Sequence, residues 1–510
     1  MNVLGLTPDE VAIAERVDAV AVEHLLPIAE RFGERHEISR ELLETMADHG
    51  LLGLNISAEY GGAGGDHRYS TLLCILREHL GYRDPGVDFT FGLQGLGTVA
   101  IVRHGTDEQR SEFLPDLVAG RRVYAFAVTE PQAGSDVRGM TTNAVLDGDV
   151  YRVTGTKTYI SGAPDADVVV LVTRTGEANG RPSYTAFLLD PAADGVTIRS
   201  DIELAAPHSI GTIVLDDVVI PADRMIGVEG EGLKVALGTL EVYRPSVGAL
   251  AVGMTQRAFD LALDVATNRS VSRGLLGDLE AIRLKLARMW ADATIGRGLV
   301  YRAAALRDAQ QNSVREAAIS KLFATEAACR AIYESQQIHG ARGVTVGRPI
   351  ESLARHARQA TIYEGTSEIQ RSIIARAELA AEPVERVGDG LDPVRDAIDR
   401  LRASPVGAEL LAEQAGAFRL ADACIALDGA ALMAEQLELL TDADDPGVAR
   451  ARCVAEIART DAVDTATSLL VDMRRRGGTD AVVDDDLAAV RAIEVSSVDD
   501  RLLELAGLLW

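Results

Sequence analysis

The chain has 510 residues, of which 47% are hydrophobic and 25% are charged, a composition typical of a globular protein rather than a disordered or collagen-like one. This length predicts about three domains. Because 77 acidic residues outnumber 51 basic ones, the net charge of -26 disfavours binding to nucleic acid or anionic lipid. No apolar run reaches the roughly 18 residues of a membrane span, and the N-terminus does not resemble a signal peptide, so we expect a cytoplasmic protein.

The cysteines and histidines indicate neither a disulfide framework nor a metal site. The four cysteines form no CxxC pair, and the nine histidines form no HExxH motif and no close pair. We therefore expect no bound metal and cysteines that remain reduced.

Helical periodicity opens the chain, with apolar residues at the spacing of amphipathic helices over 9–32, 39–51, 67–80 and 107–119. The pattern then changes to alternation and β-branched residues, which predict strands over 123–130, 144–161, 167–175, 185–190 and 211–220. Asp147-Gly148, between two such runs, predicts a β-hairpin. Helical periodicity returns over 231–268, 278–309, 313–339 and 367–379.

This order of elements predicts the fold class and the domains. A run of helices, a block of antiparallel strands and a second run of helices are typical of an α+β protein with a β layer between helical domains. The predicted domains are an N-terminal helical domain (1–122), a middle antiparallel β domain (123–227), a C-terminal helical bundle (228–380) and an additional helical extension (381–510).

The extension at 381–510 is strongly acidic. It contains 27 acidic residues and 13 arginines, a net charge of -14, so more than half of the chain's imbalance lies there. An acidic stretch of this length could be a disordered tail. Its apolar residues nevertheless keep helical spacing, which predicts a folded layer with an acidic outer face.

Two glycine-containing segments and one absent motif limit the possible chemistry. Gly95-Leu96-Gly97 begins like a GxGxxG motif, but Ala100 ends it and no strand–helix unit surrounds it, so a Rossmann site is not expected. The glycines of 61–65 indicate a turn. No GxSxG motif accompanies a plausible acid–base pair, so a serine hydrolase is not expected either.

Two polar segments at the ends of predicted strands could bind a ligand. Residues 128–136 (VTEPQAGSD) could hold a heteroaromatic ring or a phosphoryl group through backbone N–H groups, or could form an ordinary polar turn. In residues 155–162 (GTKTYISG), alternation predicts Lys157, Tyr159 and Ser161 on one face. That face suits a flat ring, but cross-strand packing would look the same.

The third polar segment consists of two stretches, residues 337–343 (QIHGARG) and residues 363–371 (YEGTSEIQR). Glu364 precedes a helix that Thr366 or Ser367 would cap. Its carboxylate could therefore be catalytic, or could only interact with the dipole of that helix.

In this order and spacing, the segments TEPQAGSD, KTYISG, QIHGARG and IYEGTSEIQR resemble the acyl-CoA dehydrogenase family of flavoproteins. The resemblance extends over roughly 7–380. It implies that FAD lies between the β domain and the C-terminal bundle, with its pyrophosphate and adenosine reached by a neighbouring subunit. It also implies dehydrogenation of an acyl thioester to the trans-2-enoyl thioester, within fatty acid metabolism.

The resemblance implies a role for each matching residue. Glu364 is expected to be the catalytic base that removes the α-proton while hydride leaves Cβ for flavin N5. The residues expected to contact substrate are Ser135, Glu241, Arg244 and Gly365. Those expected near the flavin ring are Phe126, Val128, Thr129, Gly134, Ser135, Tyr159 and Ser161. Those expected to hold the rest of FAD are Arg269, Gln337, Gly340, Thr366 and Glu368, with Arg269 and Gln337 acting across a dimer.

The chain departs from the family pattern at three places. Where the family commonly has Arg-x-Gln-Phe-Gly, Arg269 is followed by Ser-Val-Ser-Arg. Gly340-Ala341 stands where Gly-Gly is usual, and Arg355-His356 stands where Arg-Asp is usual. Each departure bears on FAD or on a subunit contact, whereas Glu364 and both β-domain motifs are retained, which favours an active enzyme.

Three functions are compatible with the sequence. The first is a dehydrogenase of acyl-CoA, or of an acyl carrier protein thioester, that passes electrons to an electron-transfer flavoprotein. The second is an acyl-CoA oxidase or a flavin monooxygenase on the same fold, although monooxygenases of this type do without the glutamate base. The third is a weakly active relative that serves as an interaction module.

The resemblance also bears on subunit assembly and on acyl-chain length. The extension resembles those of very-long-chain dehydrogenases and acyl-CoA oxidases, where added helices occupy the surface that tetramers use. A homodimer is therefore expected rather than a tetramer. The depth of the acyl pocket is expected to depend on residues around 88–99 and 240–250.

Overall fold

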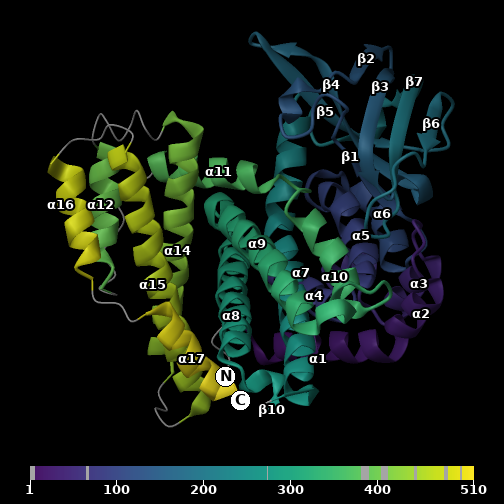
Figure 1. Ribbon diagram of the computed structural model, residues 1–510. Coiled ribbons are helices and arrows are strands. Elements are labelled where there is room, and N and C mark those ends of the chain that lie inside the picture. The colour runs from purple at the N-terminus through teal and green to yellow at the C-terminus, as the bar shows by residue number, and fades with distance from the viewer. Residues whose placement is uncertain are drawn as a thin grey trace. The chain divides into compact units, whose positions relative to one another are not determined.

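The computed structural model describes residues 6–64, 68–272, 274–380, 390–403, 412–440, 445–475, 481–493 and 497–509. The chain forms two compact units, and helix α7 (Gly232–Asn268) belongs partly to each. The N-terminal unit is Asp9–Ser246, and the C-terminal unit is Val247–Trp510 together with Met1–Pro8. Helices, a β-sheet and further helices follow one another along the chain, which confirms the α+β prediction (Figure 1). No helix in the described ranges is long and apolar enough to cross a membrane.

The helices of the N-terminal unit follow the predicted pattern with one exception. They are α1 (Pro8–Val20), α2 (Leu26–Phe32), α3 (Arg40–Asp48), α4 (Tyr69–Arg83), α5 (Pro85–His104) and α6 (Asp107–Val118). Helix α5 was not predicted, because it is buried on nearly all sides and therefore lacks an amphipathic period. Gly97 allows α5 to pack closely against Tyr124, since a Cβ on residue 97 would lie 2.6 Å from Cβ of Tyr124.

One sheet of eight strands forms the β layer of this unit. Its strands are β1 (Tyr124–Ala127), β2 (Asn143–Asp147), β3 (Val150–Ser161), β4 (Val168–Ala178), β5 (Arg181–Leu189), β6 (Val196–Arg199), β7 (Ile210–Pro221) and β8 (Met225–Ile226). The order is β6-β7-β3-β2-β4-β5-β8, with β1 also paired to β4. The hairpin predicted at Asp147-Gly148 is confirmed and joins β2 to β3. The sheet is largely antiparallel as expected, but β1 and β2 pair with β4 in parallel.

The C-terminal unit begins with a helical bundle. Its helices after α7 are α8 (Glu280–Asp308), α9 (Val314–His339), α10 (Pro349–Ala360) and α11 (Ser367–Ala380). Helix α10 was not predicted, although Ile350, Leu353 and Ala357 carry a helical period that could have identified it.

The extension is a packed helical layer, as its apolar spacing predicted. Figure 1 shows α12 (Asp392–Ala403), α14 (Gln414–Glu438), α15 (Pro446–Arg475) and α16 (Ala481–Arg491) side by side, and α17 (Val498–Leu509) completes the layer. Leu322 and Ile374 of the bundle share one buried apolar cluster with Leu420 and Ile457 of the extension. The two parts of this unit therefore have a common core.

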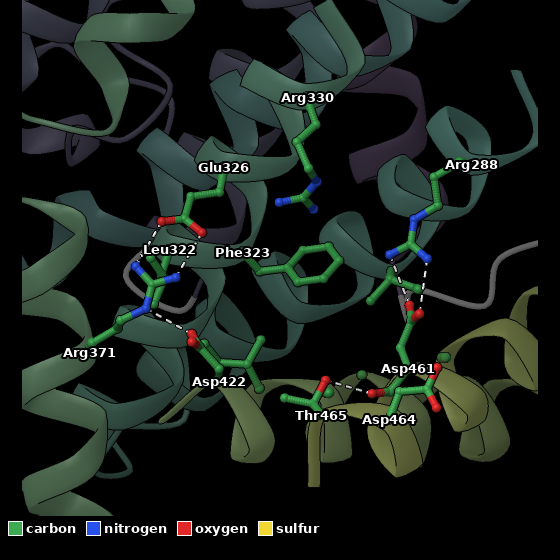
Figure 2. A pocket seen from close by; sticks show the side chains of 15 residues that line it. Arg288, Leu322, Phe323, Glu326, Arg330, Arg371, Asp422, Asp461, Asp464 and Thr465 are labelled. Carbon is green, nitrogen blue, oxygen red and sulfur yellow. Dashed lines mark hydrogen bonds and ion pairs between the residues drawn. The ribbon is translucent and has the colours of Figure 1, made fainter. Parts of the chain in front are cut away.

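Paired charges also join the extension to the bundle, around a pocket of about 290 Å³ (Figure 2). Arg371 of α11 donates to both carboxylate oxygens of Glu326, at 2.8 and 2.9 Å, and to Asp422 of α14 at 2.8 Å. On the other side of the pocket, Arg288 of α8 pairs with Asp461 of α15 at 2.9 Å. Both arginines belong to bundle helices, so they fix the extension to the bundle through charge as well as through the apolar core.

Candidate active site

The loop that follows β1 contains the TEPQAGSD segment, and a buried ion pair holds it. The Lys157 ammonium donates to the Glu130 carboxylate at 2.8 Å and to the carbonyl of Val128 at 2.9 Å. Both charged side chains are fully buried. The Glu130 carboxylate also accepts hydrogen bonds from the backbone N–H groups of Thr141 and Thr142. The loop is therefore pinned to strand β3 and to the segment that leads into β2.

This pairing keeps Glu130 ionised. Burial alone would raise the pKa of Glu130, but the Lys157 ammonium and hydrogen bonds from Thr141 and Thr142 outweigh burial and lower that pKa to about 2. Because the folded-state pKa is below its ordinary value of 4.5, the resulting stabilisation is present above pH 4.5. It is lost as the pH falls through about 2.

Replacing Lys157 with Met should strongly destabilise this unit. The substitution leaves the buried Glu130 carboxylate without its counter-charge, which should lower the free energy of unfolding by about 3–5 kcal/mol. The measurement is the guanidinium unfolding midpoint. A double variant, Lys157→Met with Glu130→Gln, carries no uncompensated charge and should recover part of the loss. If Lys157→Met alone unfolds at the wild-type midpoint, the pair does not anchor the loop.

Tyr159 has a strained backbone at the end of β3. Its φ of 54° lies in the left-handed region that non-glycine residues rarely adopt, and its side chain is 60% exposed. The cause is a bulge, because the register between β3 and β7 shifts between Lys157 and Ile160. The prediction that Lys157, Tyr159 and Ser161 share one face is therefore wrong for Lys157. The side chain of Lys157 is buried, whereas Tyr159 is exposed.

The remaining residues expected near the flavin ring lie on β1, its loop and the end of β3. Phe126 is half-buried on β1, and Val128 and Thr129 follow it. Gly134 and Ser135 are exposed in the loop, and among the described residues no atom lies within 4 Å of where a Cβ on Gly134 would be. This open backbone is accessible to a flat ligand.

Helix α7 carries two residues expected to contact substrate. Glu241 and Arg244 are three residues apart and so share one side of the helix. Arg244 is buried and Glu241 is half-buried. Both belong to the N-terminal unit.

The segments expected to set the depth of the acyl pocket are tightly packed within the N-terminal unit. Arg77 of α4 pairs with Asp88 of α5 through two hydrogen bonds of 2.8 and 3.1 Å, and donates to Ser246 at 3.2 Å. Arg77 and Asp88 are 3% and 0% exposed. The Tyr243 hydroxyl packs against Gly95 so closely that a Cβ on Gly95 would lie only 1.9 Å from the hydroxyl oxygen. Side chains therefore fill the space between α4, α5 and α7 here.

Glu364 lies in the turn that precedes α11, and its backbone is also in the left-handed region, with a φ of 55°. Five non-glycine residues with positive φ occur in the described part of the chain, and Tyr159 and Glu364 are two of them. Strained backbone of this kind is typical of functional sites when the surrounding structure holds it in place.

Two buried side chains hold the Glu364 turn. The Lys321 ammonium of α9 donates to the carbonyl of Gly365 at 2.8 Å, and the Gln370 amide donates to the same carbonyl at 2.9 Å and to that of Glu364 at 3.3 Å. Gly365 has a φ of 97°, which strongly favours glycine, and a Cβ there would lie 2.6 Å from the Gln370 amide nitrogen and disturb its hydrogen bonds.

The start of α11 follows the sequence prediction. The Thr366 hydroxyl accepts a hydrogen bond from the backbone N–H of Ile369 at 3.4 Å, which makes Thr366 the cap. Glu368 is exposed, and hydrogen bonds from its own backbone N–H and from Thr366 lower its pKa.

A second group of expected site residues forms an exposed polar surface at the ends of α7 and α9. Arg269 lies beside Gly340, since its Nη1 would be 3.6 Å from a Cβ on that glycine. Within the described ranges Arg269 forms no ion pair, so its charge is available to an anion. Gln337 is also exposed and donates to the Tyr333 hydroxyl at 3.1 Å. Of the segment that departs from the family pattern, Arg273 is outside the described residues.

The expected site residues form two sets, one on each unit. The set on the N-terminal unit is Phe126, Val128, Thr129, Gly134, Ser135, Tyr159, Ser161, Glu241 and Arg244. The set on the C-terminal unit is Arg269, Gln337, Gly340, Glu364, Gly365, Thr366 and Glu368. The sequence did not predict that Lys157 would be buried and paired with Glu130, or that Lys321 would hold the Glu364 turn. For Lys321 the available signal was a lone lysine in a largely apolar segment, whereas Lys157 stands among polar residues that give no such signal.

Comparisons with known proteins show the family to which the chain belongs. Three family profiles match in chain order: the acyl-CoA dehydrogenase N-terminal domain at 7–121, the middle domain at 125–218 and the C-terminal domain at 230–379. A 3-(aryl)acrylate reductase of Clostridium sporogenes is 34% identical over 70% of this chain and 94% of its own length. The mitochondrial short-chain specific acyl-CoA dehydrogenase of Bos taurus is 34% identical over 70% of this chain and 86% of its own length.

Two solved structures differ in how much of this chain they match. Butyryl-CoA dehydrogenase of Megasphaera elsdenii has a TM-score of 0.70 at 30% identity, and the match covers 74% of this chain and 99% of the other. An FAD-complexed acyl-CoA dehydrogenase of Bacillus anthracis has a TM-score of 0.87 at 23% identity, and this match covers 99% of this chain and 95% of the other. The second likeness shows a shared fold that includes the extension. The chain belongs to the acyl-CoA dehydrogenase family and is an oxidoreductase.

Proposed function

We propose that this enzyme dehydrogenates an acyl thioester to the trans-2-enoyl thioester, with Glu364 as the base. The observation that supports this most is the Glu364 turn itself. Lys321 and Gln370 hold the backbone of this turn, in which Glu364 has a positive φ, immediately before the capped start of α11. A general base must be placed to within hydrogen-bond reach of the proton that it removes, and this turn supplies such rigidity.

The reaction removes a proton from Cα and a hydride from Cβ of the acyl group. Glu364 accepts the proton, and its backbone N–H stabilises the negative charge that develops on the thioester oxygen. Bound FAD supplies the acceptor for the hydride. The residues that we assign to the thioester are Ser135, Glu241 and Arg244 of the N-terminal unit and Gly365 of the C-terminal unit.

The described residues fit FAD in two places. Tyr159, Ser161, Phe126, Val128, Thr129, Gly134 and Ser135 provide an exposed ring, a hydroxyl and an open backbone for the isoalloxazine. Arg269, beside Gly340, provides an uncompensated positive charge and a site without a side chain for the pyrophosphate. Gln337, Thr366 and Glu368 complete the set that we assign to FAD.

Arg269→Ala should loosen FAD. A charge-assisted contact to a pyrophosphate contributes about 1.5–3 kcal/mol, so the variant should be purified partly without flavin and should regain it when FAD is added. Flavin occupancy is measured from the absorbance ratio of flavin to protein. Arg348→Ala, which removes another exposed arginine of the same unit, is the control and should remain loaded. Full occupancy in Arg269→Ala would show that this arginine does not hold FAD.

We infer that the acyl group is compact. We assign the acyl pocket to the segments around 88–99 and 240–250, where the Tyr243 hydroxyl fills the space over Gly95. The guanidinium of Arg77, which is paired with Asp88, lies over the Tyr243 ring at 5.9 Å from its centroid. Such packing leaves little depth for a long chain. Relatives named for short-chain, butyryl and acryloyl substrates support this choice.

An electron-transfer flavoprotein is the proposed electron acceptor. One relative, 32% identical, is named as the CarC subunit of a caffeyl-CoA reductase–Etf complex. A structural neighbour at 26% identity is a prolyl acyl carrier protein oxidase, so transfer to oxygen and a carrier-protein thioester are the alternatives. Stopped-flow mixing of the reduced enzyme with oxygen or with an electron-transfer flavoprotein distinguishes these acceptors.

We propose a homodimer. Around Arg269 and Gln337, the C-terminal unit exposes Tyr333, Val344 and Val346 by 59%, 69% and 79%, an apolar surface that suits a second subunit. The acidic extension covers the bundle and would repel a second copy of itself at low salt. Gel filtration with light scattering should give twice the chain mass, whereas a mass of four chains would refute the dimer.

A further inference from the structure

The Ser161 hydroxyl has a specific buried partner. The Nε2 atom of His208 lies 2.7 Å from Oγ of Ser161, and His208 is only 7% exposed. Ser161 ends strand β3, whereas His208 belongs to the segment between β6 and β7. Both residues are in the N-terminal unit, and this contact was not expected from the sequence.

The position of the His208 ring is fixed from two directions. Phe89 of α5 packs against it edge-on, with ring centroids 4.9 Å apart. The neighbouring Ser209 is anchored as well, since its carbonyl accepts from Gly162 N at 2.7 Å and its hydroxyl donates to Asp165 at 2.6 Å. The imidazole therefore cannot move far from Ser161.

A hydroxyl has one proton, so its partner decides what it can offer to a third group. If His208 Nε2 accepts that proton, Ser161 has only lone pairs left for a ligand. If Nε2 carries a proton and donates it, the Ser161 hydroxyl can donate to the ligand.

We propose that His208 is a positioning residue that sets the direction of the Ser161 hydroxyl and thereby its hydrogen bond to the flavin ring. This inference rests on the proposed function, which places Ser161 at the ring. Oxidised and reduced flavin differ in the protons that they carry, so a hydroxyl of fixed direction stabilises one form more than the other. His208 would then adjust the equilibrium between the two forms without touching the flavin itself.

The test measures the equilibrium constant for reduction of the bound flavin against a dye of known potential, in the holoenzyme without acyl substrate. His208→Phe keeps an aromatic ring but removes the hydrogen bond, and His208→Asn, with its shorter side chain, is a second disrupting variant. We expect each of these and Ser161→Ala to shift the constant roughly two- to tenfold in the same direction. The double variant Ser161→Ala with His208→Phe should shift it no further than either change alone.

His208→Gln should remain close to wild type, because its amide can donate or accept near the position of Nε2. His24→Phe, the same type of change elsewhere in this unit, should leave the constant unchanged. If Ser161→Ala shifts the constant while both disrupting variants match wild type, the inference is overturned and the proposed function stands. Additive effects in the double variant would also overturn it. If none of the variants shifts the constant, Ser161 does not contact the flavin, and its assignment fails together with this inference.

Discussion

Glu364→Gln should retain FAD and bind acyl-CoA, but its flavin should be reduced at least about 100-fold more slowly than in the wild type. The amide keeps the shape of the side chain and the Lys321 and Gln370 contacts to the turn, which involve only backbone carbonyls. It cannot accept the α-proton, and loss of a general base alone slows a reaction about 10²–10⁴-fold. Anaerobic stopped-flow absorbance of the flavin band measures this rate directly.

Glu280→Gln is the matched control, since Glu280 is an exposed glutamate in the first turn of α8 in the same unit. It should reduce its flavin at the wild-type rate. Reduction of Glu364→Gln at that rate would place the base elsewhere and would remove the main support for the proposed reaction.

Removal of the extension should have the second large effect. A chain that ends at Ala380 would expose the bundle side of an apolar cluster that includes Leu322 and Ile374. It would also remove Asp422 and Asp428, which form ion pairs with Arg371 and Arg315 of the bundle. We expect this chain to be insoluble or to associate into large particles, as measured by the soluble fraction and light scattering.

Two point variants test the same claim within the full chain. Leu420 is completely buried in α14, so Leu420→Asp places a charge in the shared core and should greatly lower the unfolding midpoint. Leu439, which follows the same helix, is 70% exposed, and Leu439→Asp should unfold like wild type. A soluble and fully active truncated chain would show instead that the extension is dispensable.

The sequence predicted most of the elements that are buried on one side, although it missed α10. The amphipathic helix α3 has a clear period, and the hairpin at Asp147-Gly148 has the expected turn residues, so both follow from local chemistry. Helix α5 was not predicted because both of its sides are buried, so its sequence shows no polar face. The four-residue strand β6 is too short to show alternation.

The candidate site was only partly predictable, for a different reason. Family motifs identified Glu364 and Tyr159, but the positive φ of each results from a turn or bulge that contacts distant in sequence impose. The pairing of Lys157 with Glu130 joins residues 27 positions apart. The contact of His208 with Ser161 joins residues 47 positions apart. Such contacts depend on the sheet topology, which periodicity does not specify.

Anaerobic titration of the FAD-loaded enzyme with acyl-CoAs of four to twenty carbons, and with one acyl carrier protein thioester, tests the central claim most directly. The proposed reaction predicts that the oxidised flavin band bleaches with at least one thioester and that the enoyl product accumulates in equal amount. The packing of Tyr243 and Arg77 predicts that short or compact acyl groups bleach it at the lowest concentrations. A flavin that stays oxidised with every thioester of the panel would contradict the assignment of this enzyme as an acyl thioester dehydrogenase.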